Sequence, residues 1–381
     1  MYPIGESSNM KVLYVGAYTG SKPVHGLPGG AKGIHVFRLD YDPDANQVNL
    51  EPISVVAAHQ PSFLCFNRNR KWLYAVCEDK NPQENKVAVY KVDNLETGQL
   101  SLVSKYDGKG TEACYVSQLD DLVFMANYSS GSAIAFKQNR SDGTLSQIWF
   151  KQFLDWSGKV ANRQEAPHIH SCVHHAQNRL LYVADLGADK VYVFEILNNS
   201  LKPFDKQPSI SFPEGSGPRH ITIHPTANFV YVACELSNTV ISFRVNTDKT
   251  LSRIQEPLNC LAENPADYFA EPQEIYQCVA DIHLTPDGRY LYVSTRGLRN
   301  NLAMFSVDQQ SGQLRLLGFE SCRGVCPRNF TIDSSGTLLL CANQDSNTIV
   351  PFRIDQNSGK LTYLDLQFHC PAPVCLEIVD V

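Results

Sequence analysis

An eight-residue apolar segment recurs seven times along this chain of 381 residues. The copies are KVLYVGAY (11–18), KWLYAVCE (71–78), DLVFMANY (121–128), RLLYVADL (179–186), NFVYVACE (228–235), RYLYVSTR (289–296) and TLLLCANQ (337–344). The fourth residues of successive copies lie 48 to 61 residues apart. A period of this size indicates an array of supersecondary units, so the fold is best interpreted as a repeat before any site is sought.

A second short apolar run follows each copy, and its fifth residue is aromatic in all seven cases, as in KVYVFEIL (190–197). After it comes a polar turn and a leucine, most clearly in TGQL, DGTL, SGQL and SGKL. Glycine supplies the positive φ of a tight hairpin, so a further strand is expected there. Ahead of copies two to seven lies one more apolar run, such as PRHITI (218–223). This pattern predicts an all-β fold, a seven-bladed β-propeller of four-stranded antiparallel blades.

The two ends of the chain predict how the ring closes. The first blade lacks the preceding strand of the other blades, while the C-terminus carries a spare one, PVCLEIV (373–379). We expect three N-terminal strands and this C-terminal strand to share the first blade, because pairing removes exposed sheet edges. A closed ring has no internal boundary, so residues 1–381 are expected to form a single propeller domain.

Composition argues against several classes of function. A net charge of −6 leaves no basic footprint for nucleic acid or for an anionic membrane surface. Residues 1–18 contain no long apolar stretch, and no segment has the roughly 20 apolar residues of a membrane span. We therefore expect a soluble, cytoplasmic protein without a secretory signal.

The twelve cysteines lie mostly inside the predicted strands and form no C-x-x-C pair. We expect buried, reduced thiols of a cytosolic protein. The nearest pair, Cys322 and Cys326, has no histidine partner in the sequence, so we expect no metal site and no cofactor. The oligomeric state stays open.

Aligning the copies shows which residues occupy equivalent positions. Counted from the fourth residue of each copy, position +4 holds Tyr18, Glu78, Tyr128, Leu186, Glu235, Arg296 and Gln344. Position −12, in the preceding strand, holds Ser62, Glu112, His170, Arg219, Ala280 and Arg328 in copies two to seven. The two positions are equidistant from the turn between the strands, so they face each other across the hairpin, away from that turn. Both rings are expected at one mouth of the central channel.

Charge gathers in one sector of this mouth. Successive blades place there His170, Arg219 with Glu235, Arg296 and Arg328. Because guanidinium groups bind carboxylate or phosphate bidentately, we expect a site for a small anionic molecule. The candidates for the opposite wall are Glu78, Asn127, Gln344 and Tyr18, with Glu112 and Tyr128 near them. His220 and His224 are expected to serve packing or turns instead.

Long links are expected at the same mouth, namely residues 20–33, residues 150–167 and the insertion around 263–276. Long loops over one face of a rigid array usually carry binding and catalysis. The sequence contains no G-x-S-x-G, no Walker loop, no G-x-G-x-x-G after a strand and no H-E-x-x-H. Serine-nucleophile and nucleotide chemistry are therefore unsupported. The role of the 255–278 insertion stays open.

Several stretches resemble one family. ANYSSGS (126–132), RQEAPHIHS (163–171), GPRHITIHP (217–225), CELSNTV (234–240) and PDGRYLYVSTRG (286–297) are similar to the seven-bladed propeller lactonases. That family includes propeller-type 6-phosphogluconolactonases and the carboxy-cis,cis-muconate cyclase. The resemblance runs over residues 14–378 and implies that His170, Arg219, Glu235 and Arg296 are the catalytic residues, acting on a small anionic lactone or carboxylate.

Three hypotheses follow. The leading one is hydrolysis of 6-phosphogluconolactone or a similar acidic sugar lactone, with Arg219 and Arg296 holding the phosphate or the oxyanion and Arg328 assisting. Either Glu235 or His170 would be the general base. The second hypothesis is a lactonising muconate cyclase, and the third is a non-catalytic propeller that binds a small anion or a protein partner.

Overall fold

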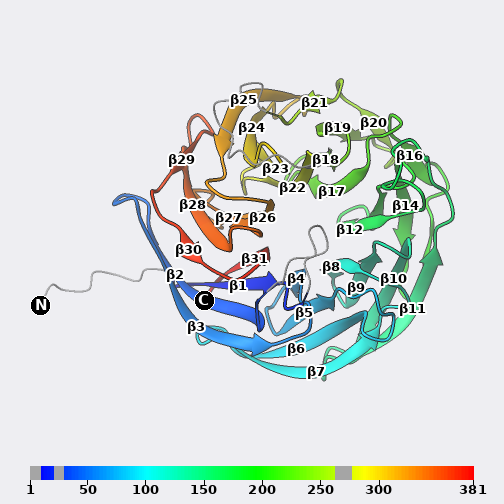
Figure 1. Ribbon diagram of the computed structural model, residues 1–381. Helices are drawn as coiled ribbons and strands as arrows, with labels where there is room; N and C mark the ends of the chain where they lie inside the picture. Colours follow the sequence, from blue (N-terminus) through cyan, green and yellow to red (C-terminus); the bar gives the residue numbers. More distant parts are fainter. Residues whose placement is uncertain (1–9, 21–29, 262–276) are drawn as a thin grey trace, which may run out of the picture.

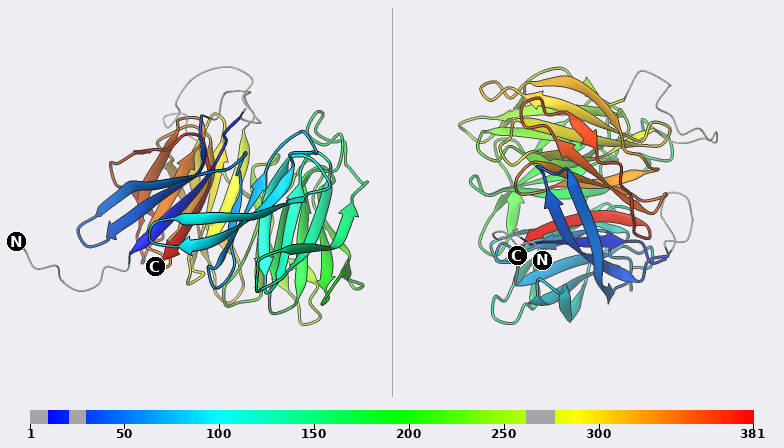
Figure 2. Two further views of the ribbon diagram at one scale, coloured as in Figure 1. Left: turned by 90° about the horizontal axis from the view of Figure 1, so that it is seen from below. Right: turned by 90° about the vertical axis from the view of Figure 1, so that its left-hand side faces the viewer.

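The computed structural model describes residues 10–20, 30–261 and 277–381. Within these ranges the chain forms no helix, and its strands pair into seven antiparallel sheets around a central axis (Figure 1). Views from the side show strands that run across the thickness of the ring (Figure 2). The predicted all-β, seven-bladed propeller is confirmed.

Every blade contributes one strand to the wall of the central channel. These inner strands are β31 (Pro373–Asp380), β4 (Leu64–Phe66), β8 (Ala113–Leu119), β12 (Ile169–His175), β17 (Pro218–Ile223), β22 (Cys278–Leu284) and β26 (Pro327–Ile332). The second strand of each blade holds the recurring eight-residue segment. These strands are β1 (Lys11–Ala17), β5 (Trp72–Cys77), β9 (Leu122–Asn127), β13 (Leu180–Asp185), β18 (Phe229–Cys234), β23 (Tyr290–Arg296) and β27 (Leu338–Asn343).

The runs with an aromatic fifth residue form the third strand of each blade. They are β2 (Gly33–Asp42), β6 (Lys86–Asn94), β10 (Ser132–Gln138), β14 (Lys190–Ile196), β19 (Thr239–Val245), β24 (Asn301–Val307) and β28 (Thr348–Ile354). Four blades have one continuous outer strand, namely β3 (Gln47–Ala57), β7 (Gln99–Asp107), β11 (Leu145–Gln152) and β25 (Leu314–Ser321). In the other three it is divided in two: β15 (Leu201–Pro203) and β16 (Ser209–Ser211), β20 (Leu251–Arg253) and β21 (Leu258–Asn259), β29 (Leu361–Tyr363) and β30 (Phe368–His369).

The first blade closes the ring as predicted. Its strand order is β3-β2-β1-β31, so three N-terminal strands share a sheet with the C-terminal one. The pairing of β1 with β31 extends from Lys11 opposite Asp380 to Ala17 opposite Pro373. Closure gives every inner strand the inner strands of two adjacent blades as neighbours around the channel.

The contacts of the tyrosine at the fourth position of the recurring segment explain why most copies have a tyrosine there. All residues of the second strands β5, β9, β13, β18, β23 and β27 are buried. In three blades the tyrosine hydroxyl donates to a backbone carbonyl in the next blade's outer turn: Tyr14 to Leu95 at 3.2 Å, Tyr231 to Gly312 at 3.1 Å and Tyr292 to Gly359 at 2.8 Å. The same side chain thus fills the core with its ring and links adjacent blades with its polar end.

Polar contacts also join the inner strands around the channel. The hydroxyl of Ser117 in β8 donates to the carbonyl of Cys172 in β12 at 2.6 Å, and that of Ser171 in β12 donates to the carbonyl of Arg219 in β17 at 2.7 Å. Asn329 in β26 serves two neighbours. Its Nδ2 donates to Asp281 in β22 at 2.6 Å, and its Oδ1 accepts from the backbone N–H of Leu376 in β31 at 2.8 Å.

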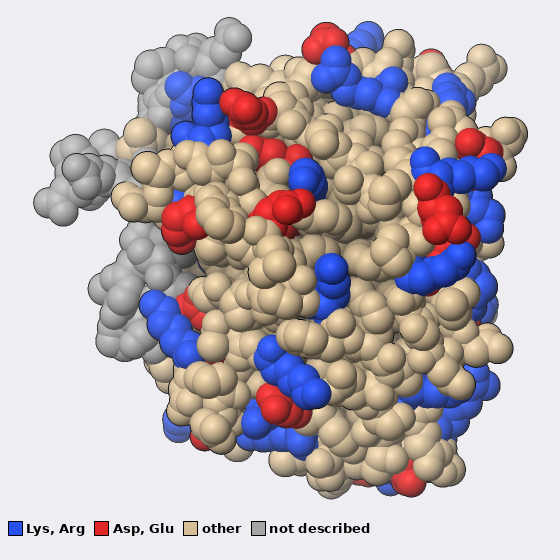
Figure 3. Space-filling view, turned by 90° about the vertical axis from the view of Figure 1, so that its right-hand side faces the viewer, with Lys and Arg blue, Asp and Glu red and all other residues tan. Residues whose placement is uncertain are grey.

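The outer wall seen in Figure 3 carries Lys and Arg interspersed with Asp and Glu, with no large area of one sign. Ion pairs of blade four illustrate the mixture, with Lys202 at 2.9 Å from Glu195 and Lys190 at 2.8 Å from Asp155. No helix in the described ranges is long and apolar enough to cross a membrane.

Of the three long links, residues 21–29 and 262–276 lie outside the described residues. The third, between β11 and β12, lies at the predicted mouth. Its Ser157 donates from the backbone to Gly187 at 2.8 Å, and its Gln164 donates from the side chain to Leu186 at 2.8 Å, both in the link between β13 and β14.

We expect Asn329→Ala to lower the free energy of unfolding by about 2–4 kcal/mol, because it leaves the buried backbone N–H of Leu376 without its partner and removes one of the hydrogen bonds to the buried Asp281 carboxylate. Chemical denaturation measures this change. Asn357→Ala, in an exposed turn, is the control and should stay within about 0.5 kcal/mol. Equal effects of the two variants would contradict the role of Asn329 in closing the ring.

Candidate active site

The inner strands break their pairing at one common height. The register in blades three, four, five and seven skips one residue, which leaves Cys114, His170, Arg219 and Arg328 outside the ladder. In blade six it skips Ala280 and Asp281. A β-bulge bends the strand and redirects the unpaired side chain. The repeat therefore brings unpaired residues of these five blades to the same end of the channel.

This pattern corrects the predicted ring at one position. Only Asp120 and Asp121 join β8 to β9, whereas four residues join β12 to β13. The shorter turn moves the equivalent residue of blade three from Glu112 to Cys114. Glu112 instead contacts the Ser129 hydroxyl and lies 3.8 Å from Lys80.

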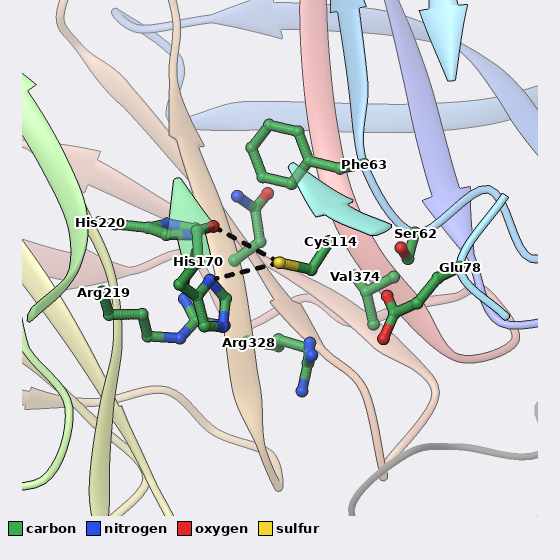
Figure 4. Close-up of a pocket in the computed structure, with 10 residues that line it drawn as sticks. Ser62, Phe63, Glu78, Cys114, His170, Arg219, His220, Arg328 and Val374 are labelled. Carbon is green, nitrogen blue, oxygen red and sulfur yellow. Dashed lines mark hydrogen bonds between the residues drawn. The ribbon is translucent and has the colours of Figure 1, made fainter. Parts of the chain in front are cut away.

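The unpaired residues line a pocket at the predicted mouth (Figure 4). Its walls are formed by Ser62, Phe63, Glu78, Cys114, His170, Arg219, His220, Arg328, Asn329 and Val374. In Figure 4, His170, Arg219 and His220 lie on one side, Glu78 and Ser62 on the other, and Arg328 between them. Four of the nine predicted site residues, His170, Arg219, Arg328 and Glu78, line this pocket. Two more contact one of those four: Tyr18 contacts Glu78, and Glu235 contacts Arg219.

Glu235, at the end of β18, is the centre of a buried ion cluster. Its Oε2 lies 2.8 Å from Nε of Arg219, although that N–H is not directed at it, and accepts from Nη2 of Arg296 at 2.9 Å. Its Oε1 accepts from Nη2 of Arg163. Burial alone would raise the pKa of Glu235, but Arg296, Arg163 and Arg219 hold it well below its usual value. Glu235 is therefore an ionised carboxylate whose oxygens are both occupied by guanidinium groups.

Arg163 is a site residue that the repeat does not reveal. It lies in the link between β11 and β12 and approaches Glu235 across the mouth. It also interacts with the hydroxyl of Tyr128. The link belongs to blade four only, so no alignment of the copies could select this residue. Two signals were available: a cationic side chain in a long link at the predicted mouth, and its place at the start of the family-like stretch RQEAPHIHS (163–171).

His170 is a neutral imidazole in the pocket wall. Burial and the charges of Arg219 and Arg328 lower its pKa well below 6.5. Its Nδ1 lies 3.7 Å from Sγ of Cys114, and its ring meets the Tyr128 ring edge to face at 5.5 Å. These contacts hold an unprotonated, desolvated histidine beside two arginines.

His220 was expected to serve packing, and this prediction is wrong. It lines the pocket, and its Nε2 lies 3.3 Å from Nη1 of Arg219, which can only donate. Its Nδ1 therefore carries the proton and donates to Asp281 at 2.7 Å. Burial, with the charge of Arg219, lowers its pKa to about 4, so Asp281 and His220 orient Arg219. His224 does serve a turn, where Nδ1 accepts from the backbone of Ala227 at 3.0 Å.

The opposite wall is formed by Glu78 with Tyr18 behind it. The Tyr18 hydroxyl donates to Oε2 of Glu78 at 3.0 Å, and the Arg328 guanidinium lies 5.6 Å from the Tyr18 ring centre. Nη1 of Arg328 is buried and has no hydrogen-bond partner among the described residues. Arg328 thus presents an unpaired donor to the pocket, unlike Arg296, which is committed to Glu235.

Asn127, Gln344 and Arg296 do not line the pocket. Asn127 is fully buried and uses its amide within the protein: Oδ1 accepts from Asn85 at 3.0 Å, and Nδ2 donates to Gly108 at 2.9 Å and to Ser132 at 3.0 Å. Gln344 is fully buried and donates to Asp345 at 2.9 Å. Their predicted contact with a ligand finds no support in these positions, because neither side chain lines the pocket.

Within the described ranges, no group of three or more His, Cys, Asp or Glu is arranged to hold a metal ion.

Comparison with known proteins gives concordant results. The family described as "Lactonase, 7-bladed beta-propeller" matches residues 12–378. A 6-phosphogluconolactonase of Formosa agariphila is 33% identical over 359 residues, which are 92% of this chain and 95% of that protein. The 6-phosphogluconolactonase of Bacillus subtilis is 32% identical over 368 residues, which are 96% and 97% of the two chains. The structure of the periplasmic gluconolactonase PpgL of Pseudomonas aeruginosa has a TM-score of 0.84 and 29% identity, covering 97% of this chain and 99% of its own.

We expect Glu235→Ala to lower the free energy of unfolding by about 3–5 kcal/mol, because it removes the carboxylate that three arginines share and leaves buried positive charge uncompensated. Urea denaturation measures the change. Glu214→Ala breaks a surface pair with Lys159 at 3.5 Å and should cost less than about 1 kcal/mol. A change of that small size in Glu235→Ala would show that the cluster is not held by this carboxylate.

Proposed function

This chain belongs to the seven-bladed β-propeller lactonase family, and we propose that it hydrolyses 6-phosphogluconolactone to 6-phosphogluconate. Two relatives that carry this activity in their names match more than nine-tenths of the chain. The protein is accordingly a lactonase, a carboxylic ester hydrolase that takes a small lactone as its substrate.

The proposed mechanism rests on one observation: a single pocket holds a neutral imidazole between two guanidinium groups. His170, Arg219 and Arg328 all line it. A lactone carbonyl needs a base to activate water and a cation where negative charge develops. A phosphate ester on the same substrate needs a second cation. The pocket supplies one group for each of these needs.

His170 is the general base on this account. Its imidazole is neutral because burial and nearby positive charge lower its pKa. It takes a proton from water as the water oxygen attacks the carbonyl carbon. Arg219 stabilises the resulting oxyanion, and such a preorganised donor contributes about 3–4 kcal/mol. Arg328, with its unpaired Nη1, binds the phosphate.

Glu235 has a different role. An acceptor whose oxygens are both occupied by arginines is a poor base, so the choice between Glu235 and His170 falls on His170. Glu235 instead positions Arg219, and Arg163 and Arg296 balance its charge. Net positive charge remains around the pocket, which favours a phosphorylated substrate over a neutral lactone.

We also propose that the protein works in the cytoplasm. Support comes from its twelve cysteines, all of them free thiols and all but Cys65 buried, as expected in a reducing compartment.

The purified protein should hydrolyse 6-phosphogluconolactone faster than buffer does, and His170→Gln should lower kcat about 10²–10⁴-fold. Because the pKa of His170 is lowered, the base is neutral at pH 7 and becomes protonated only as the pH falls below the usual histidine range. The acidic limb of kcat/KM should therefore lie below pH 6.5. A pH-stat or coupled dehydrogenase assay measures both values.

His369→Gln, at an exposed position, is the matched control and should retain wild-type kinetics. If the wild-type protein hydrolysed 6-phosphogluconolactone no faster than buffer, the proposed function would be refuted. Wild-type activity in His170→Gln would refute the assigned base.

Arg328→Ala should raise the KM for the phosphorylated lactone by about 10- to 100-fold, because a charge-assisted contact to phosphate contributes about 1.5–3 kcal/mol. The KM for unphosphorylated gluconolactone should change less than threefold. Steady-state kinetics with both substrates measures the difference, and Arg315→Ala, on the exposed face of β25, is the control. An equal rise for both lactones would place the phosphate elsewhere.

A further inference from the structure

Opening a lactone requires a second proton transfer, to the ring oxygen. When the ring C–O bond breaks, its electron pair passes to the ring oxygen, which leaves as an alkoxide. An alkoxide is a poor leaving group at neutral pH, and a positioned acid accelerates such a step about 10²–10⁴-fold. His170 receives its proton on the carbonyl side of the pocket, and a separate acid on the far side would protonate the ring oxygen without any movement of the imidazolium.

Glu78 is the carboxyl group in the opposite wall. It follows β5, is 6% exposed and lines the pocket together with His170. Figure 4 shows the two on opposite sides with Arg328 between them. The Tyr18 hydroxyl holds Oε2 at 3.0 Å, which fixes one carboxyl oxygen.

The surroundings of Glu78 favour its protonated form. Burial raises its pKa, and this effect exceeds the opposing effects of Arg328, Ser62 and Tyr18, while Glu112 raises it further. Cys114, the other titratable group facing it, is a neutral thiol because burial raises its pKa. A phosphate bound to Arg328 would offset the charge of that arginine. The pKa of Glu78 would then rise further when substrate is bound.

The chemistry of the substrate matches this arrangement. In a 1,5-lactone with a 6-phosphate, the ring oxygen lies along the chain between the carbonyl carbon and the phosphate. With the phosphate on Arg328 and the carbonyl near His170 and Arg219, the ring oxygen lies toward the wall that carries Glu78. Two groups whose environments shift their pKa values in opposite directions form a natural base and acid pair.

We propose that Glu78 is the general acid that protonates the leaving ring oxygen. This inference rests on the proposed lactonase function and on His170 as the base. In each turnover one water is consumed, its O–H proton passes to His170, and the Glu78 proton passes to the new hydroxyl group. Solvent then returns a proton from His170 to Glu78, so the enzyme ends as it began.

The test is the pH profile of kcat for Glu78→Gln, with Glu84→Gln as the matched control. Glu84 is an exposed carboxylate in the same link between β5 and β6. We expect Glu78→Gln to lower kcat about 10²–10³-fold with KM within threefold, and to lose the alkaline limb that wild type and Glu84→Gln retain. A raised KM with unchanged kcat would make Glu78 a binding residue and overturn the proposal, as would an alkaline limb kept by Glu78→Gln.

Tyr18→Phe provides an independent test should Glu78→Gln fail to fold. Tyr18 donates to Glu78 and so stabilises its ionised form. Removing that bond raises the pKa of Glu78, and the alkaline limb should move to higher pH. An unmoved limb would overturn the proposal. Inactive wild-type protein would refute the lactonase function itself, whereas active wild type with unchanged variants would refute only the role of Glu78.

Discussion

The site depends on one backbone constraint, the bulge that interrupts the inner strands of most blades at the same end of the channel. Pairing skips Cys114, His170, Arg219 and Arg328 in four different blades. A regular ladder would turn these side chains alternately toward the two faces of each sheet. The bulge instead frees them at the end of the channel, where residues distant in sequence form one pocket. Ring closure by β31 keeps these positions in place, because the inner strands contact one another all the way round.

Buried charge then divides the pocket into two halves. On one side Glu235 binds three arginines, and burial and the charge of Arg219 lower the pKa of the neighbouring His170. On the other side burial raises the pKa of Glu78 and outweighs the opposing charge of Arg328. Burial thus lowers the pKa of His170 and raises the pKa of Glu78, because it disfavours the charged form of each group. The division suits a reaction that removes one proton and delivers another.

The repeat alone was sufficient to predict the architecture, because period and strand pattern follow from burying one face of each sheet. It also located His170, Arg219, Glu235 and Arg328, since equivalent positions share a height in the ring. It failed where a blade departs from the pattern. A turn two residues shorter put Cys114 in the position assigned to Glu112, and Arg163 comes from a link with no counterpart. His220 was misjudged because it follows the bulge directly, and only the bulge explains how consecutive residues can both line the pocket.

The central claim is that the substrate lies between His170 and Glu78 with its phosphate on Arg328. The most direct measurement is a crystal structure of the protein with 6-phosphogluconate bound. The account predicts density in this pocket, with the phosphate in contact with Arg328 and the carboxylate beside Arg219 and His170. Density at the opposite mouth of the channel, or a phosphate bound away from Arg328, would contradict it.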